Sequence, residues 1–155
     1  MAGPVEDRRA GGAAVADRLA CGDFLPVMCW RWGFPGRPDQ VAQVREISRP
    51  LLAGHPLEGD ILLVLSELLS NAIRHTRSAR PGGLVVTEVR RWRRGVAVAV
   101  IDQGGPNEPV LRTAGETLDA FAEGGRGLLT VDAYATWWRW HGDARSRTVT
   151  AFFLR

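Results

Sequence analysis

The sequence predicts an α/β protein of the two-layer sandwich class, with a mixed, mainly antiparallel sheet and helices on one face. Short turns separate the later strands, as is typical of antiparallel neighbours. Two helical segments stand between the first strand and the second. The 155 residues suit a single domain with a sizeable core. The expected order is strand, helix, helix, strand, strand, loop, helix, strand, strand.

The N-terminal end differs in composition from the rest of the chain. Residues 1–24 are dominated by Ala, Gly and charge, so we expect a disordered or loosely docked tail before a domain at 25–155. The tail lacks the continuous apolar core of a secretory signal. The longest apolar runs, at 61–65 and 96–101, are far shorter than the roughly 20 residues that span a bilayer. We therefore expect a soluble, cytoplasmic protein with no membrane partner.

The basic residues limit the chemistry that the chain can perform. All 20 are arginine, which excludes Schiff-base lysine chemistry and a P-loop. Any positive contact to a phosphate must come from Arg, a helix N-terminus or a metal ion. Cys21 and Cys29 have neither the number nor the setting of a disulfide framework, so we expect free thiols. His55, His75 and His141 are too scattered to predict a shared metal site.

The first half of the domain predicts one strand and two helices. Residues 27–34 alternate in polarity before a proline- and glycine-containing break, which is typical of a strand leading into a turn. A helix follows from Asp39, the expected N-cap, until Gly54 and Pro56 end it. Its apolar residues recur at helical spacing, at Val41, Val44, Ile47 and Leu51. A second helix is expected to begin near Leu57.

Two strands, at 84–91 and 96–101, are expected to form a hairpin around a short Arg-Gly turn. The RRWRR run at 90–94 raises the alternative of a nucleic-acid interface, in which Arg contacts phosphate and Trp92 stacks on bases. The run is better explained as a solvated hairpin tip, and no second basic cluster supports the alternative. We therefore expect no direct contact with nucleic acid.

The last part of the chain predicts a loop, a helix and a closing hairpin. Residues 103–123 are rich in Gly, Pro, Thr and charge, and a connection of this length is often a lid over a site or a disordered segment. A short helix is expected from Gly124 through Ala135. Strands at 137–142 and 147–155 then form a hairpin around Gly142 and Asp143, with the tryptophans at 137, 138 and 140 packing within the sheet.

Glu67 and Asn71 are the first candidates for a functional site. They lie four residues apart in the second helix and therefore share a face with Arg74 and His75. An adjacent apolar stripe comprises Ile61, Leu65, Leu68, Leu69 and Ala72. An unpaired carboxylate is costly to bury, so Glu67 must face solvent or a polar cavity. Asn71 offers an amide oxygen of the type that ligates Mg²⁺. An ordinary exposed Glu and Asn would look the same in this helix alone.

Two glycine-containing segments add to this pair. Asp102 ends an apolar strand, where its carboxylate can accept a hydrogen bond from an exocyclic amine such as that of adenine, and Gly104 and Gly105 allow close approach of the backbone to a flat ring. Residues 125–128 place flexible backbone at a helix start, where free N–H groups attract phosphate. A plain turn and a plain hinge remain alternatives for the two segments taken separately.

In this order, the three segments resemble the nucleotide-binding motifs of the GHKL ATPase superfamily, whose members include gyrase, histidine kinases and bacterial anti-sigma-factor serine/threonine kinases. The resemblance covers roughly residues 27–155. The sequences SELLSNAIRH and GRGLLTVDAYA are most similar to the anti-sigma-factor kinases. The resemblance implies the Bergerat-type, histidine-kinase-like ATPase fold, with ATP and Mg²⁺ as cofactors.

The resemblance also implies a role for individual residues. Glu67 corresponds to the catalytic base, Asn71 to the Mg²⁺ ligand and Asp102 to the residue that reads adenine. Gly104 is expected to shape the adenine pocket. The remaining expected contacts to the nucleotide are His75, Gly125, Arg126, Gly127, Leu128 and Thr148. The chain departs from the usual Asp-x-Gly-x-Gly pattern at Pro106, where the second glycine is expected and where proline fixes φ and removes a donor.

Two functions follow from the resemblance. The first is a transcription-regulating protein kinase that phosphorylates an antagonist protein and otherwise holds a sigma factor. The second is a non-enzymatic module in which ATP or ADP orders the 103–123 loop and selects protein partners. Family members commonly form homodimers, and the apolar face of the helix at 41–53 is a candidate for that surface.

Overall fold

The computed structural model describes residues 6–7, 28–106, 109 and 126–154. The strands are β1 (Glu6–Asp7), β2 (Met28–Pro35), β3 (Leu84–Trp92), β4 (Gly95–Asp102), β5 (Trp137–Gly142) and β6 (Arg147–Leu154). The helices are α2 (Gln40–Leu52), α3 (Glu58–His75), the short 3₁₀ turn η1 (Arg77–Ala79) and α4 (Arg126–Tyr134). The predicted order of elements is confirmed for the domain.

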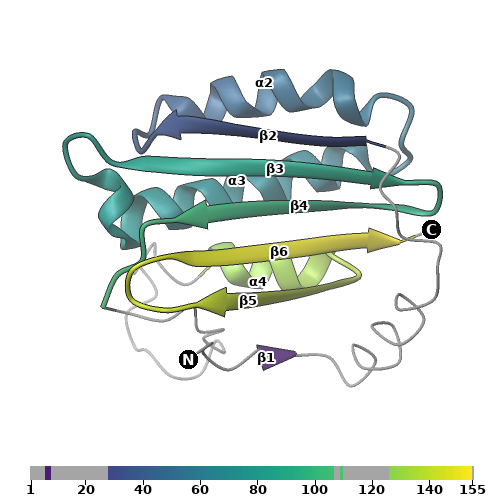
Figure 1. Ribbon diagram of the computed structural model, residues 1–155. Coiled ribbons are helices and arrows are strands. Elements are labelled where there is room, and N and C mark those ends of the chain that lie inside the picture. The colour runs from purple at the N-terminus through teal and green to yellow at the C-terminus, as the bar shows by residue number, and fades with distance from the viewer. Residues whose placement is uncertain (1–5, 8–27, 107–108, 110–125, 155) are drawn as a thin grey trace.

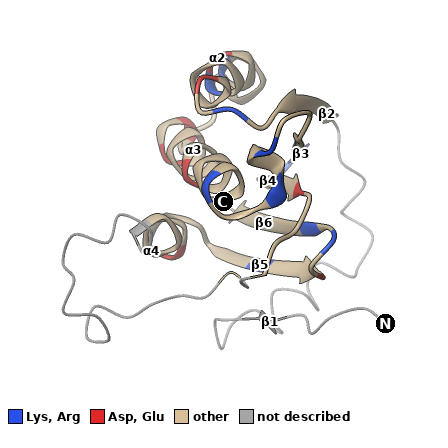
Figure 2. Ribbon diagram, turned by 90° about the vertical axis from the view of Figure 1, so that its left-hand side faces the viewer, with Lys and Arg blue, Asp and Glu red and all other residues tan. Residues whose placement is uncertain are grey.

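The strands form one six-stranded sheet in the order β1-β5-β6-β4-β3-β2. Every strand pairing in the described part of the chain is antiparallel, so the expected mixed sheet is instead antiparallel throughout. Helices α2, α3 and α4 cover one face of it (Figures 1 and 2). The two-layer sandwich predicted from the sequence is confirmed.

β1 is a two-residue strand from the segment expected to be a tail. Its residues pair with Trp140 and Arg139 of β5. The rest of that segment lies outside the described residues. No helix among the described residues is long and apolar enough to cross a membrane.

The register of β4 and β6 determines which residues face the helices. Val98 pairs with Ala151 and Val100 with Val149, and all four belong to the main core cluster together with the apolar residues of α3. Side chains alternate between the two faces of a strand. Continuing the alternation by one step places Asp102 on the helix-covered face, at the end of β4.

The stripe expected on α3 is confirmed, since Ile61, Leu65, Leu68, Leu69 and Ala72 are all buried. Thr76 ends the helix. Its hydroxyl donates to the carbonyl of Ala72 at 2.5 Å and accepts from the backbone N–H of Ser78 at 3.2 Å. The buried stripe fixes the rotation of α3, and with it the direction of the polar face.

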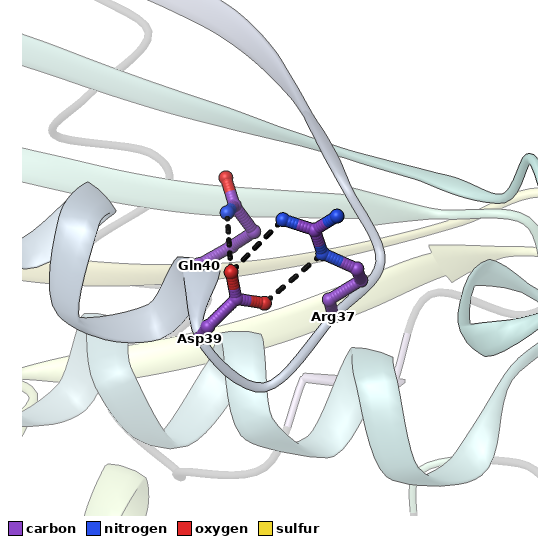
Figure 3. Close-up of polar contacts among 3 residues, drawn as sticks. All are labelled: Arg37, Asp39 and Gln40. Atoms are coloured by element: carbon purple, nitrogen blue, oxygen red, sulfur yellow. Dashed lines mark hydrogen bonds and ion pairs between the residues drawn. The ribbon is translucent and has the colours of Figure 1, made fainter.

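The α2 helix starts where the sequence predicted, but Asp39 does not cap it. The Asp39 carboxylate accepts from Arg37 Nη2 at 2.9 Å and from Gln40 Nε2 at 3.1 Å (Figure 3), and these contacts lower its pKa. Asp39 itself has α-helical φ and ψ, whereas an N-cap residue normally lies outside that region. The predicted side-chain cap is therefore wrong, because a neighbouring arginine holds the carboxylate.

The candidate dimer face on α2 is smaller than expected. Val44 is fully buried, and Val41 and Leu51 pack against the core. Only Ile47, 37% exposed, remains as a large exposed apolar side chain of the helix. A homodimer through this face stays a prediction.

The arginine run at 90–94 spans the turn between β3 and β4, as predicted, with Arg93 and Arg94 exposed. The other two arginines have structural partners. Arg90 Nε lies 2.7 Å from Glu88 Oε1, and Arg91 Nη1 donates to the carbonyl of Leu51 at 3.0 Å, at the end of α2. Half of the run thus contributes to the fold.

The β5–β6 hairpin closes at the predicted turn. Gly142 has φ of 124°, and Asp143 Oδ1 accepts from the backbone N–H groups of Arg145 and Ser146. The tryptophans pack as expected: Trp138 and Trp140 lie in the main core, and Trp137 stacks on Phe152 on the opposite face, with ring centroids 3.9 Å apart. Most of the loop expected at 103–123 lies outside the described residues.

Candidate functional site

The polar face of α3 meets the start of α4. A Cβ atom added to Gly127 would lie 2.8 Å from Asn71 Nδ2, 2.9 Å from Asn71 Oδ1 and 3.0 Å from Glu67 Oε2. The carboxylate and the amide therefore converge on the backbone of Gly127, the second residue of α4. Glu67 and Asn71 are both half-buried. A side chain at 127 would have to displace the ends of these two side chains, so glycine allows the polar face of α3 to approach the start of α4 this closely.

Asp102 forms the second part of the site. It is 5% exposed, and its Oδ1 accepts a 2.6 Å hydrogen bond from the backbone N–H of Gly104. Burial raises its pKa, while the Gly104 hydrogen bond and the positive charge of Arg147 oppose that rise. An ionised carboxylate has about four lone-pair sites, so the Gly104 hydrogen bond does not exhaust the capacity of Asp102 to accept from a ligand.

The turn after Asp102 is bonded to the segment that follows α3. Ser78 Oγ accepts from the backbone N–H of Gln103 at 3.0 Å, and the carbonyl of Gly104 accepts from the backbone N–H of Arg77 at 2.8 Å. A Cβ atom on Gly105 would lie 2.8 Å from the carbonyl oxygen of His75. The last turn of α3 and the end of β4 therefore lie in contact with each other.

The tip of the β5–β6 hairpin lies against the same turn. A Cβ atom on Gly104 would lie 2.3 Å from the carbonyl oxygen of Ala144, and Gly104 has φ of 65°. Arg77 Nη1 donates to the carbonyl of Ala144 at 2.9 Å. Three segments distant in sequence thus converge around Gly104.

Helix α3 connects the two parts of the site. Its rise of about 1.5 Å per residue separates Asn71 from His75 by about 6 Å along the axis. Asn71 lies beside Gly127, and the carbonyl of His75 lies beside Gly105. The arrangement suits an elongated ligand with one end at Asp102 and a polar end at Glu67 and Asn71.

The structure brings together most, but not all, of the residues expected at this site. Glu67, Asn71 and Gly127 form one group, and Asp102 and Gly104 form the other. His75 borders the second group through its backbone, while its side chain is exposed. Of the remaining candidates, Leu128 packs against the hydrophobic core, Arg126 is the first residue of α4, and Gly125 lies outside the described residues.

Thr148 lies on the wrong face of the sheet for this site. It pairs with Ile101 and His141, whereas Asp102 pairs with its neighbour Arg147. Because the side chains of a strand alternate between faces, Thr148 points away from the helices. The expected contact of Thr148 with the ligand group around Asp102 is therefore not formed.

Arg147 is the residue of this region that sequence reasoning missed. It is 4% exposed, lies opposite Asp102 and donates from Nη2 to the carbonyl of Gly105 at 2.8 Å. The alternation of side chains along β6 could have revealed it, since Arg147 lies two and four residues before the core residues Val149 and Ala151 and therefore on the same face. An arginine on the core-facing side of a strand predicts a buried charge.

These residues fit a magnesium-bound nucleoside triphosphate. The amide oxygen of Asn71 is a hard ligand of the kind that Mg²⁺ accepts alongside phosphate oxygens and water. Gly127 brings the amide of Asn71 to the start of α4, where backbone N–H groups favour anions. Asp102 supplies a buried acceptor for a base amine.

The fold is a two-layer α/β sandwich, and the candidate site lies between its helical layer and the end of β4. The family model of the histidine kinase-like ATPase domain matches residues 34–153, and the chain belongs to that family. It is therefore a GHKL-type, ATP-binding domain. A comparison with curated proteins found no match.

Substitution of Gly127 by alanine tests the close contact between the polar face of α3 and the start of α4. We expect Gly127→Ala to weaken Mg²⁺-ATP binding about tenfold, the low end of the loss when the support of a metal ligand is changed, because the added Cβ must displace the ends of the Asn71 and Glu67 side chains. Titration calorimetry measures the effect. Gly59→Ala is the matched control, since Gly59 is the second residue of α3 and has open space where its Cβ would lie. Equal affinities for both variants would contradict a role of this contact in nucleotide binding.

Proposed function

We propose that this protein is an ATP-dependent serine/threonine kinase of the partner-switching type. It would transfer the γ-phosphoryl group of ATP to a hydroxyl of an antagonist protein, and otherwise hold a sigma factor. The convergence of Glu67 and Asn71 on Gly127 is the observation that carries the proposal, because it offers a base beside a metal-phosphate site. The resemblance of the α3 and α4 sequences to anti-sigma-factor kinases supports the choice of partners.

Each group has a separate task in this proposal. When bound, Mg²⁺ would supply charge neutralisation at the phosphates, held by Asn71. Asp102 would accept a hydrogen bond from the adenine amine and thereby orient the nucleotide along α3. Glu67 would accept the proton of the attacking hydroxyl. Phosphoryl transfer depends mainly on positioning and charge stabilisation, which such an arrangement provides.

Calorimetric titration with ATP and ADP, with and without Mg²⁺, tests the nucleotide site. We expect Asp102→Asn to weaken ATP binding about 10- to 150-fold, since a hydrogen bond to a charged group contributes about 1.5–3 kcal/mol. Asn71→Ala should instead remove the Mg²⁺ dependence while leaving metal-free binding nearly unchanged. The two variants therefore separate recognition of the base from coordination of the metal.

Two outcomes would oppose this assignment of residues. Unchanged ATP affinity in Asp102→Asn would exclude Asp102 as the base-reading residue. Retained Mg²⁺ dependence in Asn71→Ala would exclude Asn71 as the ligand. No ATP binding by folded wild-type protein would contradict the kinase proposal itself, and would favour a partner-binding scaffold.

Pro106 favours a second function, a non-enzymatic module that binds protein partners according to its nucleotide. Pro106 is exposed and directly follows the turn at Gly104 and Gly105, where it provides no N–H group for a phosphate. Binding of ATP without phosphate transfer to any candidate antagonist, with Glu67 and Asn71 intact, would favour this function. Pro106→Gly restoring transfer would identify the proline as the cause.

A further inference from the structure

Arg147 is a buried cation whose position no motif explains. It begins β6, pairs with Asp102 across the sheet, and is 4% exposed. Arginine is rarely buried this fully unless its charge is compensated. Both side chains lie on the helix-covered face, because Val100 and Val149, two residues away in the same strands, do. A positive and a negative group thus adjoin at the base end of the site.

The contacts of Arg147 hold it against the turn that follows Asp102. Its Nη2 donates to the carbonyl of Gly105 at 2.8 Å, and its guanidinium carbon lies 5.8 Å from the centroid of the Trp140 ring. A cation over an aromatic ring at this distance is attracted by it. Groups from β5 and from the 102–105 turn therefore hold the guanidinium in position.

We propose that Arg147 is a positioning residue of the nucleotide pocket, which keeps Asp102 a charged acceptor and fixes the Gly104–Gly105 turn beside the base. This inference rests on the proposed binding of the nucleotide base at Asp102. Arg147 acts through Asp102 and Gly105, and it contacts no reacting atom. It thereby determines which purine the pocket selects.

The selectivity follows from hydrogen-bond chemistry. An ionised carboxylate only accepts hydrogen bonds, whereas a protonated one also donates. The 6-amino group of adenine donates and the 6-oxo group of hypoxanthine accepts, so a charged Asp102 favours adenine. Burial raises the pKa of Asp102, and Arg147 opposes that rise. Without the charge of Arg147, Asp102 should therefore become protonated at a higher pH.

Other charged or titratable groups lie on the segments that meet this turn. They are exposed to solvent, and comprise Arg74 and His75 of α3, Arg77 and Arg80 around η1, and Asp143 and Arg145 of the hairpin tip. Exposed charges interact weakly because water and salt screen them. Arg147 is the charged side chain among the causes of the Asp102 pKa shift.

The experiment compares ATP and inosine triphosphate binding to full-length protein from about pH 4 to about pH 8, across the ordinary carboxylate range. As the pH is lowered, we expect the ATP affinity of Arg147→Gln to begin to fall at a higher pH than that of wild type. At pH values below the pKa of Asp102, we also expect the preference for ATP over inosine triphosphate to be lower than in wild type, by up to about tenfold per unit of pKa change. Arg147→Lys, which keeps the charge, should retain the preference. Arg145→Gln is the matched control on the same hairpin and should behave as wild type.

A ligand-free measurement makes the inference independent of ATP binding. The carboxyl ¹³C chemical shift of Asp102, followed by NMR against pH, should give a higher pKa in Arg147→Gln than in wild type or Arg147→Lys. An equal pKa in all three proteins would overturn the inference, as would loss of the purine preference in the Lys variant. If Arg147→Gln does not fold, Arg147→Met, which also removes the charge, takes its place in both measurements. Wild type that binds no ATP would instead refute the proposed function.

Discussion

Glu67→Gln is expected to reduce phosphoryl transfer by about 10²- to 10⁴-fold, the usual contribution of a positioned general base. Glutamine keeps the size of the side chain beside Gly127 but cannot accept a proton from the attacking hydroxyl. Affinity for Mg²⁺-ATP should change little, because Asp102 and Asn71 remain. Transfer of labelled phosphate to a candidate antagonist measures the first effect, and calorimetry measures the second.

Glu58→Gln provides a matched control on the same helix. Glu58 lies nine residues before Glu67, on the opposite face of α3, and its Oε1 is 3.5 Å from Arg49 Nη1. Loss of this partly exposed ion pair should cost at most about 1 kcal/mol of stability and leave transfer unchanged. Equal transfer by Glu67→Gln and wild type would remove Glu67 from the mechanism.

Gly104→Ala is expected to destabilise the protein by about 2–5 kcal/mol. The left-handed φ of 65° costs a residue with a Cβ about 1–2 kcal/mol, and the added atom would lie 2.3 Å from the Ala144 carbonyl, an overlap that costs about 1–3 kcal/mol more. The obstructing atom belongs to the backbone, so relief requires the hairpin tip or the turn itself to move. ATP binding should fall with the loss of this geometry.

Gly82→Ala separates the two causes. Gly82 has φ of 79°, but no atom would lie within 4 Å of its Cβ. Gly82→Ala should therefore lose only about 1–2 kcal/mol of stability, which is the cost of the left-handed backbone, and retain nucleotide binding. Urea unfolding measures both variants. Equal losses of stability would show that the contact with Ala144 contributes nothing.

Much of the fold was predictable because local patterns specified it. The apolar stripe of α3 recurs at helical spacing, and its five predicted residues are all buried. Strands β3 and β4 were predicted to within two residues at each end. The hairpin turn at Gly142 and Asp143 follows from the preference of these residues for turns. Periodicity depends only on residues close together in the sequence, so the sequence is sufficient to reveal it.

The candidate site was predictable only in part. The spacing of Glu67 and Asn71 shows that they share a helix face, and the position of Asp102 at a strand end was also correct. Thr148 was expected near the nucleotide from the family resemblance, but a shift of one residue along a strand moves a side chain to the other face of a sheet. The register with β4 selects Arg147 instead.

The sequence by itself determined the class of the fold, the helix that carries Glu67 and Asn71, and the strand that ends at Asp102. Only the tertiary structure decided that Gly127 lies against the side chains of the first pair, that the Ala144 carbonyl lies against Gly104, and that Arg147 pairs with Asp102. Periodicity and turn preference depend on residues close together in the chain. Contacts between segments 40 or more residues apart depend instead on strand register and helix packing, which only the folded chain establishes.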